Sequence, residues 1–114
     1  MKEFLLIFRR DESKIEPRSP EQMQTMMKPW QDWMGSIAAQ NKLVTPGNRL
    51  ENDGAVLKAS NIITNGPYVE TKESVGGYTI IKAASIEEAI ELSKGCPILQ
   101  DGGNVEVRAI VPMN

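Results

Sequence analysis

The residues best suited to chemistry gather in the segment Asn65–Tyr78, whose sequence is NGPYVETKESVGGY. It offers the phenols of Tyr68 and Tyr78 and the carboxylate of Glu70. Its Gly76-Gly77 pair allows a neighbouring strand or a ligand to approach the backbone closely. A desolvated Glu70 would have a raised pKa and could act as a general base, although such a glutamate more often stabilises a turn. For Tyr78 we expect a core position or a cavity wall rather than proton donation.

A second polar pair lies near the C-terminus. Glu106 and Arg108 are two residues apart, so they share one face of the strand predicted there. An arginine can hold a carboxylate or phosphate ligand through two parallel hydrogen bonds. The alternative is an internal ion pair of Arg108 with Glu106, or with Glu70 from the loop. The sequence leaves ligand recognition and internal pairing open.

Several kinds of active site are excluded because the chain contains no histidine. Histidine is the commonest general base near neutral pH and a common zinc ligand, so Ser–His and Cys–His nucleophile pairs cannot form within one chain. No loop has calcium-site spacing, and Gly76-Gly77 lacks the G-x-G-x-x-G dinucleotide pattern. Cys96 follows a predicted helix C-terminus, where the dipole disfavours a thiolate. We expect no metal and no cofactor, and whether the protein is an enzyme stays open.

The charge balance argues against nucleic-acid binding. Thirteen Lys and Arg face 15 Asp and Glu, for a net charge of −2 and a pI of about 5.2, whereas nucleic-acid binders normally carry a basic face. The longest apolar run, Phe4–Phe8, is far shorter than the roughly 20 residues that span a bilayer. The start MKEFLLIF lacks signal-peptide features, and one cysteine fits a reducing compartment. We therefore expect a cytoplasmic protein without direct nucleic-acid or membrane contact.

The element most able to build a pocket is a helix predicted from Ser19 to about Gln40. Ser19 suits the N-cap and Pro20 the first helical position. Met and Trp residues then recur every three or four positions and form one apolar stripe. Pro29 lies inside this stretch and costs about 3 kcal/mol in a helix interior, so we expect a kink or a break near Lys28.

This stripe has two interpretations. Flexible Met side chains fill gaps where a helix packs on a sheet, which is the commoner arrangement. Alternatively, Trp30 or Trp33 lines an apolar ligand cavity, and one tryptophan can serve both purposes. Asp32 lies between them and could be a general base if desolvated, but its expected place is the solvated face of the helix.

Alternating apolar residues predict the strands. Lys2–Arg9 is apolar on both faces, so both faces should be covered. Further strands are predicted at Leu43–Gly47, which Pro46 places at a sheet edge, at Tyr78–Ala83 and at Val105–Val111.

The middle of the chain contains several turn signals. Asp53-Gly54 is a hairpin signal, and Ala55–Ala59 and Ile62–Thr64 are predicted strands that join at Ser60-Asn61. Asn65-Gly66-Pro67 is a strong signal for chain reversal. The structured loop that it opens should enter a central strand and border a pocket.

A second helix is predicted from Ser85 to about Lys94. Ser85 and Glu88 have capping-box spacing, and Gly95 and Pro97 end the helix. Its buried face should contain Ile86, Ala89, Ile90 and Ser93.

The order of these elements predicts one domain over residues 1–114 with an α+β fold. Strand, helix, several strands, helix and strand form a ferredoxin-like sandwich, in which two main helices cover one face of an antiparallel sheet. A bare apolar face is unusual on a monomer. We therefore expect a homodimer that packs two sheets face to face and encloses a barrel-like cavity.

The motif NGPYVETKESVGGYTIIKAASIEEAIELSKGCP, followed by GGNVEVRAI, resembles the YCII-related proteins and, more narrowly, their DGPF-domain branch. That branch is named for Asp-Gly-Pro-Phe, and this chain has Asn65-Gly66-Pro67-Tyr68 in its place, followed by Val69-Glu70-Thr71-Lys72-Glu73. The ending Val105-Glu106-Val107-Arg108 also matches, as do the first strand and the Ser19-Pro20 helix start. The resemblance covers nearly the whole chain.

The resemblance implies a dimeric α+β barrel within a family that has no single settled activity. Some YCII-like relatives are thought to be enzymes that act on small aromatic or chlorinated rings through a His–Asp pair. Others are encoded beside, or fused to, extracytoplasmic-function sigma factors. Here Asn65 replaces the motif Asp and histidine is absent, so a His–Asp mechanism does not carry over.

Three hypotheses follow from the sequence. The first is a dimeric protein that binds a small apolar or aromatic molecule. The second is an enzyme that uses carboxylate or tyrosine chemistry, and the third is a regulatory partner of a sigma factor. The residues that we expect near the ligand are Trp30, Trp33, Tyr68, Glu70, Tyr78, Glu106 and Arg108.

Overall fold

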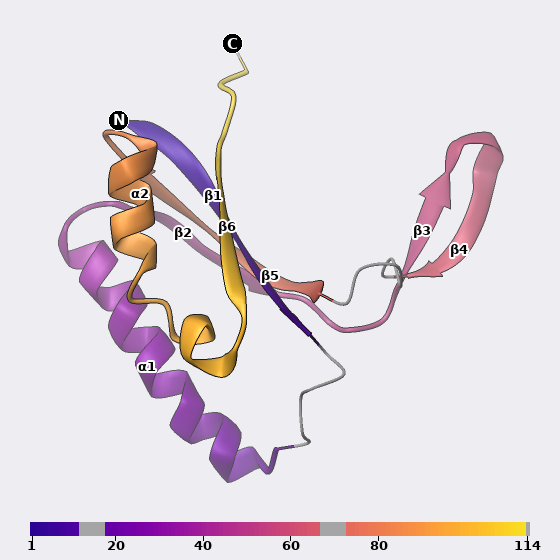
Figure 1. Ribbon diagram of the computed structural model, residues 1–114, viewed down its shortest axis with the longest axis horizontal. Coiled ribbons are helices and arrows are strands. Elements are labelled where there is room, and N and C mark those ends of the chain that lie inside the picture. The colour runs from indigo at the N-terminus through magenta and orange to yellow at the C-terminus, as the bar shows by residue number, and fades with distance from the viewer. Residues whose placement is uncertain (12–17, 67–72, 114) are drawn as a thin grey trace.

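The computed structural model describes residues 1–11, 18–66 and 73–113. Along the chain the elements are β1 (Lys2–Asp11), α1 (Pro20–Ala39), β2 (Leu43–Arg49), β3 (Gly54–Lys58), β4 (Ile62–Gly66), β5 (Glu73–Ala83), α2 (Ile86–Ser93) and β6 (Asn104–Ala109). Short 3-10 turns occupy Ala59–Asn61 and Pro97–Asp101. Their arrangement is shown in Figure 1.

Four strands form an antiparallel sheet in the order β2-β5-β1-β6. The helices α1 and α2 both pack on one face of this sheet (Figure 1). This is the ferredoxin-like α+β arrangement that the order of elements predicts. β2 is an edge strand, in agreement with the presence of Pro46.

The hydrophobic core lies between the sheet and the two helices. Phe4, Leu6 and Phe8 of β1 point into it and are 1%, 0% and 5% exposed. Leu5 and Ile7 point to the opposite face and are only partly buried. In the described part of the chain that opposite face carries no helix, so only one of the two apolar faces of β1 is fully covered.

The helix α1 begins as its sequence predicts. The Ser19 side chain accepts a hydrogen bond from Gln22 N at 3.1 Å, and the Gln22 side chain accepts one from Ser19 N at 2.9 Å. The helix then runs unbroken through Pro29, so the predicted break does not occur. Pro29 is exposed, while Trp33 and Ile37 are buried against the sheet. Tertiary packing of this apolar face stabilises the helix despite the missing backbone donor.

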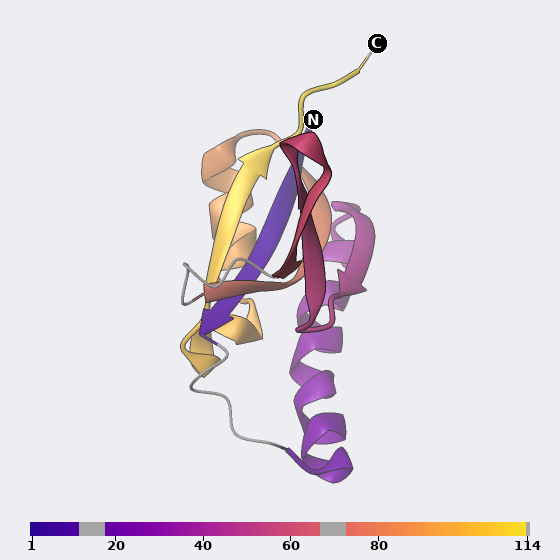
Figure 2. The ribbon, with the colours of Figure 1, turned by 90° about the vertical axis from the view of Figure 1, so that its right-hand side faces the viewer.

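The N-terminal half of α1 extends past the ends of the strands, which Figures 1 and 2 show from two directions. Up to Trp30 the residues of α1 are exposed or partly buried, whereas the buried residues Trp33 and Ile37 follow. An apolar helix surface therefore lies beside the end of the sheet, where the sheet covers it only in part.

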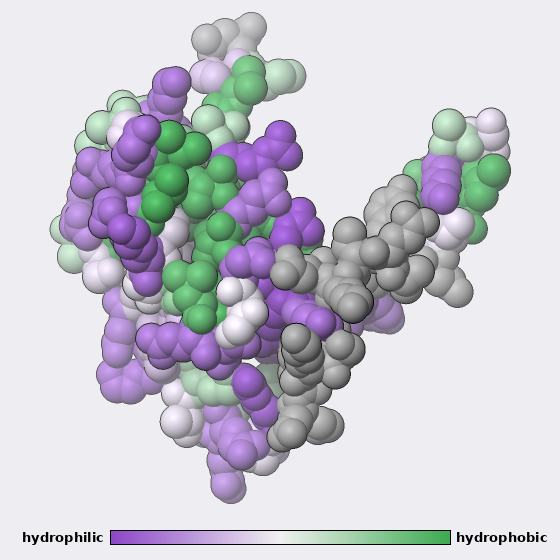
Figure 3. All heavy atoms as spheres, in the orientation of Figure 1, coloured by the Kyte–Doolittle hydropathy of each residue, from purple (hydrophilic) through white to green (hydrophobic). Residues whose placement is uncertain are grey.

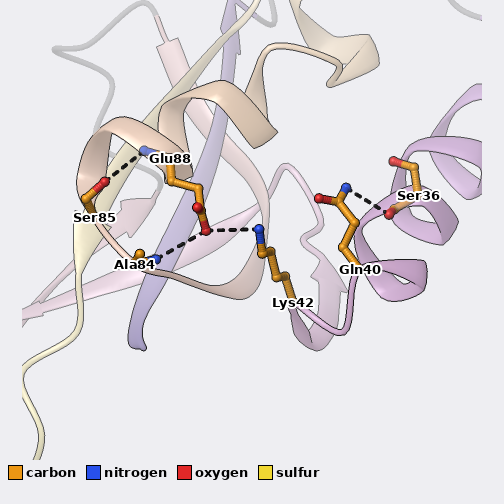
Figure 4. A network of polar contacts seen from close by, with 6 residues as sticks. All are labelled: Ser36, Gln40, Lys42, Ala84, Ser85 and Glu88. Atoms are coloured by element: carbon orange, nitrogen blue, oxygen red, sulfur yellow. Dashed lines mark hydrogen bonds and ion pairs between the residues drawn. The ribbon is translucent and has the colours of Figure 1, made fainter.

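The start of α2 is held by polar contacts that reach Lys42, which lies between α1 and β2 (Figure 4). Ser85 accepts a hydrogen bond from Glu88 N at 3.2 Å, but the Glu88 carboxylate accepts from Ala84 N rather than Ser85 N, so the predicted capping box is only half formed. Lys42 Nζ lies 3.1 Å from the same carboxylate oxygen. The hydrogen bond from Lys42, and then that from Ala84, lowers the pKa of Glu88 below its ordinary value of 4.5. Because the pKa of Glu88 is lower in the folded state, its contacts stabilise the fold at pH values above 4.5. This stabilisation is lost as the pH falls below 4.5 and Glu88 becomes protonated in the folded state too.

The helix α2 buries a narrower face than its sequence suggests. Ala89 and Ser93 are buried as predicted, but Ile86 and Ile90 are each 44% exposed. Ser93 Oγ donates to Ala89 O at 2.8 Å. These small residues bring the helix axis close to the sheet, so the larger side chains on either side lie at the margin of the contact.

The strands β3 and β4 form a separate two-stranded sheet, residues Gly54–Gly66, which we call the arm. They join where predicted, at Ser60 and Asn61, whose φ angles of 67° and 61° reverse the chain. The arm projects away from the main sheet (Figure 1), and hydrophobic residues lie on its surface (Figure 3). Leu57 and Ile63 are paired across it and are 66% and 70% exposed.

One turn prediction in this region is wrong. Asp53-Gly54 makes no hairpin between β2 and β3, because β2 pairs with β5 and β3 pairs with β4. Asn65 and Gly66 pair with Ala55 and Gly54 at the end of the arm. The rest of the predicted chain reversal and loop, residues 67–72, lies outside the described residues.

Candidate functional site

A cavity of about 500 Å³ lies between the N-terminal half of α1, the adjoining ends of β1 and β5, and the last residues of β2. Phe8 and Thr79, whose side chains are buried on the helix-facing side, are part of its wall. The cavity therefore forms within one chain, under α1, rather than over the uncovered sheet face. The pocket is lined by Phe8, Arg10, Arg18, Met23, Met26, Met27, Trp30, Gln31, Met34, Pro46, Gly47, Asn48, Arg49, Gly76, Gly77, Tyr78, Thr79 and Ile98.

One wall of the pocket is the apolar stripe of α1. Its helical spacing of three or four residues places four methionines and Trp30 on one side of the helix. The Trp30 ring packs edge to face against Phe8, with centroids 5.1 Å apart. Met27 remains 54% exposed although it belongs to this wall. An apolar ligand could bury this surface. These residues are Met23, Met26, Met27, Trp30 and Met34.

Trp33 occupies the core instead of the pocket wall. It is 6% exposed, and its indole Nε1 donates to Leu92 O at 2.9 Å. Its ring packs edge to face against Phe8 and Trp30, each at a centroid distance of 5.9 Å. Trp33 thus links α1 to α2 and supports Phe8 and Trp30, which line the pocket.

The backbone of β2 forms the opposite rim. Gly47 has a left-handed φ of 73°, and a Cβ there would lie 1.9 Å from Tyr78 O. Gly77 similarly faces Asn48, with Asn48 O 2.9 Å from the position of a Cβ. The predicted close approach at Gly76-Gly77 is confirmed, and the neighbour is this edge strand. Thr79 Oγ1 donates to Pro46 O at 2.9 Å and further holds the rim.

Three arginines from different parts of the chain line the pocket. Arg10 lies near the end of β1, Arg18 just before α1, and Arg49 at the end of β2. Arg18 Nη1 lies 3.9 Å from Asp101 Oδ2 and also contacts the sulfur of Met26. No Asp or Glu is found among the described residues of the lining.

Tyr78 is the other sequence-predicted residue that lines the pocket together with Trp30. Its hydroxyl accepts a hydrogen bond from Asn48 Nδ2 at 2.9 Å. This contact ties β5 to β2 at the rim. Two further candidates, Tyr68 and Glu70, lie outside the described residues.

Glu106 and Arg108 lie away from the pocket, in an ion-paired group on the uncovered sheet face. Glu106 accepts from Arg9 Nε at 3.1 Å, and Arg108 lies 3.8 Å from its other oxygen. Asp32, considered as a base, is exposed on α1 and pairs with Lys28 at 3.1 Å. The structure therefore gives Glu106 and Asp32 paired, partly or largely exposed environments rather than desolvated ones.

Cys96 is buried, with an exposed fraction of 1%. Burial raises the pKa of its thiol to about 11. The thiol therefore stays protonated near neutral pH, which agrees with the expectation that it is unreactive.

The described residues contain no cluster of three side chains able to hold a metal ion. In the same part of the chain, neither helix combines the length and hydropathy required to traverse a bilayer.

The sequence signals account for only part of this site. The Met and Trp stripe is visible as a helical pattern, and it predicts the apolar wall. The arginines are separated by eight residues or more along the chain and carry no shared motif. Only the folding of β1, α1 and β2 around one cavity brings them together.

Comparison with protein families finds one match over almost the whole chain. A family model described as YCII-related domain matches residues 3–114. The matched range includes all of the pocket residues and the arm. A search of curated proteins finds no match.

Proposed function

The chain belongs to the YCII-related family, and we propose that it is a small-molecule-binding protein whose ligand occupies the pocket under α1. The observation that carries this proposal is the cavity of about 500 Å³ with Met and Trp walls. Small-molecule sites have volumes of about 300–1,000 Å³ and mostly apolar linings. Placement in the DGPF branch, a cytoplasmic location and a link to sigma factors stay predictions.

The chemistry of the lining favours binding over catalysis. Among the described residues, the pocket contains no carboxylate, cysteine or lysine that could serve as a base or nucleophile. Asn48 and the three arginines supply hydrogen-bond donors that can orient a ligand. Flexible Met side chains adapt to apolar ligands of different shapes.

We further propose that two copies of the chain form a homodimer through the uncovered sheet face. Leu5, Ile7 and Ile80 lie there with partly exposed side chains. The arm is a second apolar surface, and an isolated two-stranded hairpin is marginally stable in water. A second copy related by two-fold symmetry could cover both surfaces, because such an interface uses the same patches on each subunit.

Ile7→Glu is expected to weaken the dimer at least tenfold. The substitution places one charge from each copy in the proposed interface, where desolvation of unpaired charges is costly. Light scattering coupled to size exclusion, over a dilution series, measures the change. Ile90→Glu is the matched control, because Ile90 is exposed on the helix side of the domain. A wild-type mass equal to one subunit at all concentrations would contradict the dimer.

Met27→Glu is expected to weaken ligand binding about tenfold, which corresponds to about 1.4 kcal/mol. Met27 is half exposed, so the change should leave folding intact while it puts a charge on the apolar wall. Thermal shift against a library of apolar and aromatic acids, alcohols and amines identifies ligands, and calorimetry then compares the variants. Gln24→Glu is the control, because Gln24 is exposed on the same helix and does not line the pocket. Equal effects of both variants would argue against this pocket.

A further inference from the structure

We infer that the pocket selects an amphipathic anion, with an apolar chain or ring and one acidic group. This inference rests on the proposed function and adds the chemical class of the ligand. Three arginines line the pocket, and no described acidic residue does. The whole chain has a net charge of −2, so this local excess of positive charge is opposite in sign to the protein as a whole.

Two of these arginines, Arg18 and Arg49, form no ion pair closer than 3.9 Å with another described residue. The ion pair of Arg18 with Asp101 has a separation of 3.9 Å, which is long for a direct hydrogen bond. Arg49 is exposed and forms no ion pair within the described part of the chain. Arg10 already interacts with another group, so we assign the binding of the acidic group to Arg49 and Arg18.

Like charges around an apolar space repel one another, and the repulsion grows as water is displaced. A neutral ligand that fills the cavity would increase this repulsion. An anionic group would reverse it, and a guanidinium can bind a carboxylate or phosphate through two hydrogen bonds. The pocket is therefore better suited to an acid than to the corresponding alcohol or amine.

The position of the apolar wall determines the rest of the ligand. Met23, Met27 and Trp30 lie on α1, whereas Arg49 lies across the pocket at the end of β2. A ligand with one acidic end and one apolar end can contact both walls at once. A compact inorganic anion would leave the methionine wall in water.

The experiment compares three ligands with the same ten-carbon chain on the full-length protein. Calorimetry at low ionic strength measures the affinities for decanoate, decanol and decyltrimethylammonium. We expect decanoate to bind at least tenfold more tightly than decanol, and the cation to bind most weakly. Raising the salt concentration should reduce the preference for decanoate, because ions screen exposed charges. Inorganic phosphate alone should show no measurable binding.

The variant R49Q tests the assignment of the charge. It should weaken decanoate binding about tenfold and leave decanol binding unchanged, and R18Q is a second, independent variant. R108Q is the control, because Arg108 is equally charged and lies outside the pocket. If decanol and decanoate bind equally to the wild type, the anion inference fails and the binding function stands. If none of the three compounds binds and the library yields only neutral or cationic ligands, the anion inference fails and the binding function stands. If the library yields no ligand at all, the proposed function fails with it.

Discussion

Trp33→Ala is expected to lower the free energy of unfolding by about 3–5 kcal/mol. A typical domain has a free energy of unfolding of about 5–15 kcal/mol, so this loss is a large part of the total. Trp33 is almost fully buried, packs against two aromatic rings and donates to Leu92 O. Its removal leaves a cavity between α1, α2 and the sheet. Chemical denaturation followed by circular dichroism measures the loss through the transition midpoint and slope.

Trp30→Ala is the matched comparison for this prediction. Trp30 is only partly buried and lines the pocket, so its truncation should destabilise the protein less than Trp33→Ala and weaken ligand binding more. Trp33→Phe keeps an aromatic ring but loses the hydrogen bond to Leu92, and should fall between wild type and Trp33→Ala in stability. A stable Trp33→Ala variant that has lost ligand binding would show that Trp33 acts in the pocket instead of the core.

Gly47→Ala is expected to destabilise the protein by about 2–5 kcal/mol. The left-handed φ of 73° costs about 1–2 kcal/mol for a residue with a Cβ. The new Cβ would also lie 1.9 Å from Tyr78 O, so the edge strand must move away from β5. Overpacking of this kind costs about 1–3 kcal/mol more. Because Pro46–Arg49 forms the pocket rim, ligand binding should weaken together with stability.

Gly35→Ala is the control for the glycine prediction. Gly35 lies within α1, and a Cβ there would have no neighbouring atom within 4 Å. Alanine has the higher helix propensity, so this variant should be as stable as wild type or more stable by up to about 1 kcal/mol. Thermal and chemical denaturation of both variants, with calorimetric binding on each, makes the comparison. A Gly47→Ala protein with wild-type stability would mean that β2 approaches β5 less closely than the structure indicates.

Much of the fold could be predicted because its signals are local. Ser19 and Ser85 accept hydrogen bonds from the backbone amide three residues further on. An N-cap hydroxyl forms this bond with its own helix, so the bond depends little on distant parts of the chain. The alternation in β1 predicted a strand with two apolar faces, although only the face of Phe4, Leu6 and Phe8 is fully covered. Ser60 and Asn61 join two strands through left-handed backbone angles, and a turn of this kind depends on its own residues.

The predictions were wrong where residues far apart in the sequence determine strand pairing, helix continuity or burial. Asp53-Gly54 has the composition of a hairpin turn, but strand pairing is chosen by the whole sheet, and β2 pairs with β5. Pro29 weakens a helix locally, and burial of Trp33 and Ile37 outweighs that weakness. Ile86 and Ile90 have the helical spacing of buried residues, but Ala89 sets how closely α2 approaches the sheet.

The sequence by itself determined the order of elements, the caps, the absence of histidine chemistry and the apolar stripe of α1. Each of these depends on residue type and on neighbours within a few positions. Tertiary structure alone decided that Trp30 lines the pocket while Trp33 packs in the core. The two tryptophans are about one helical turn apart, and only the neighbouring elements determine that one faces the pocket and the other is buried. It also decided that Arg10, Arg18 and Arg49 line one cavity. Charges that are far apart in the chain interact only after folding brings them around a common space.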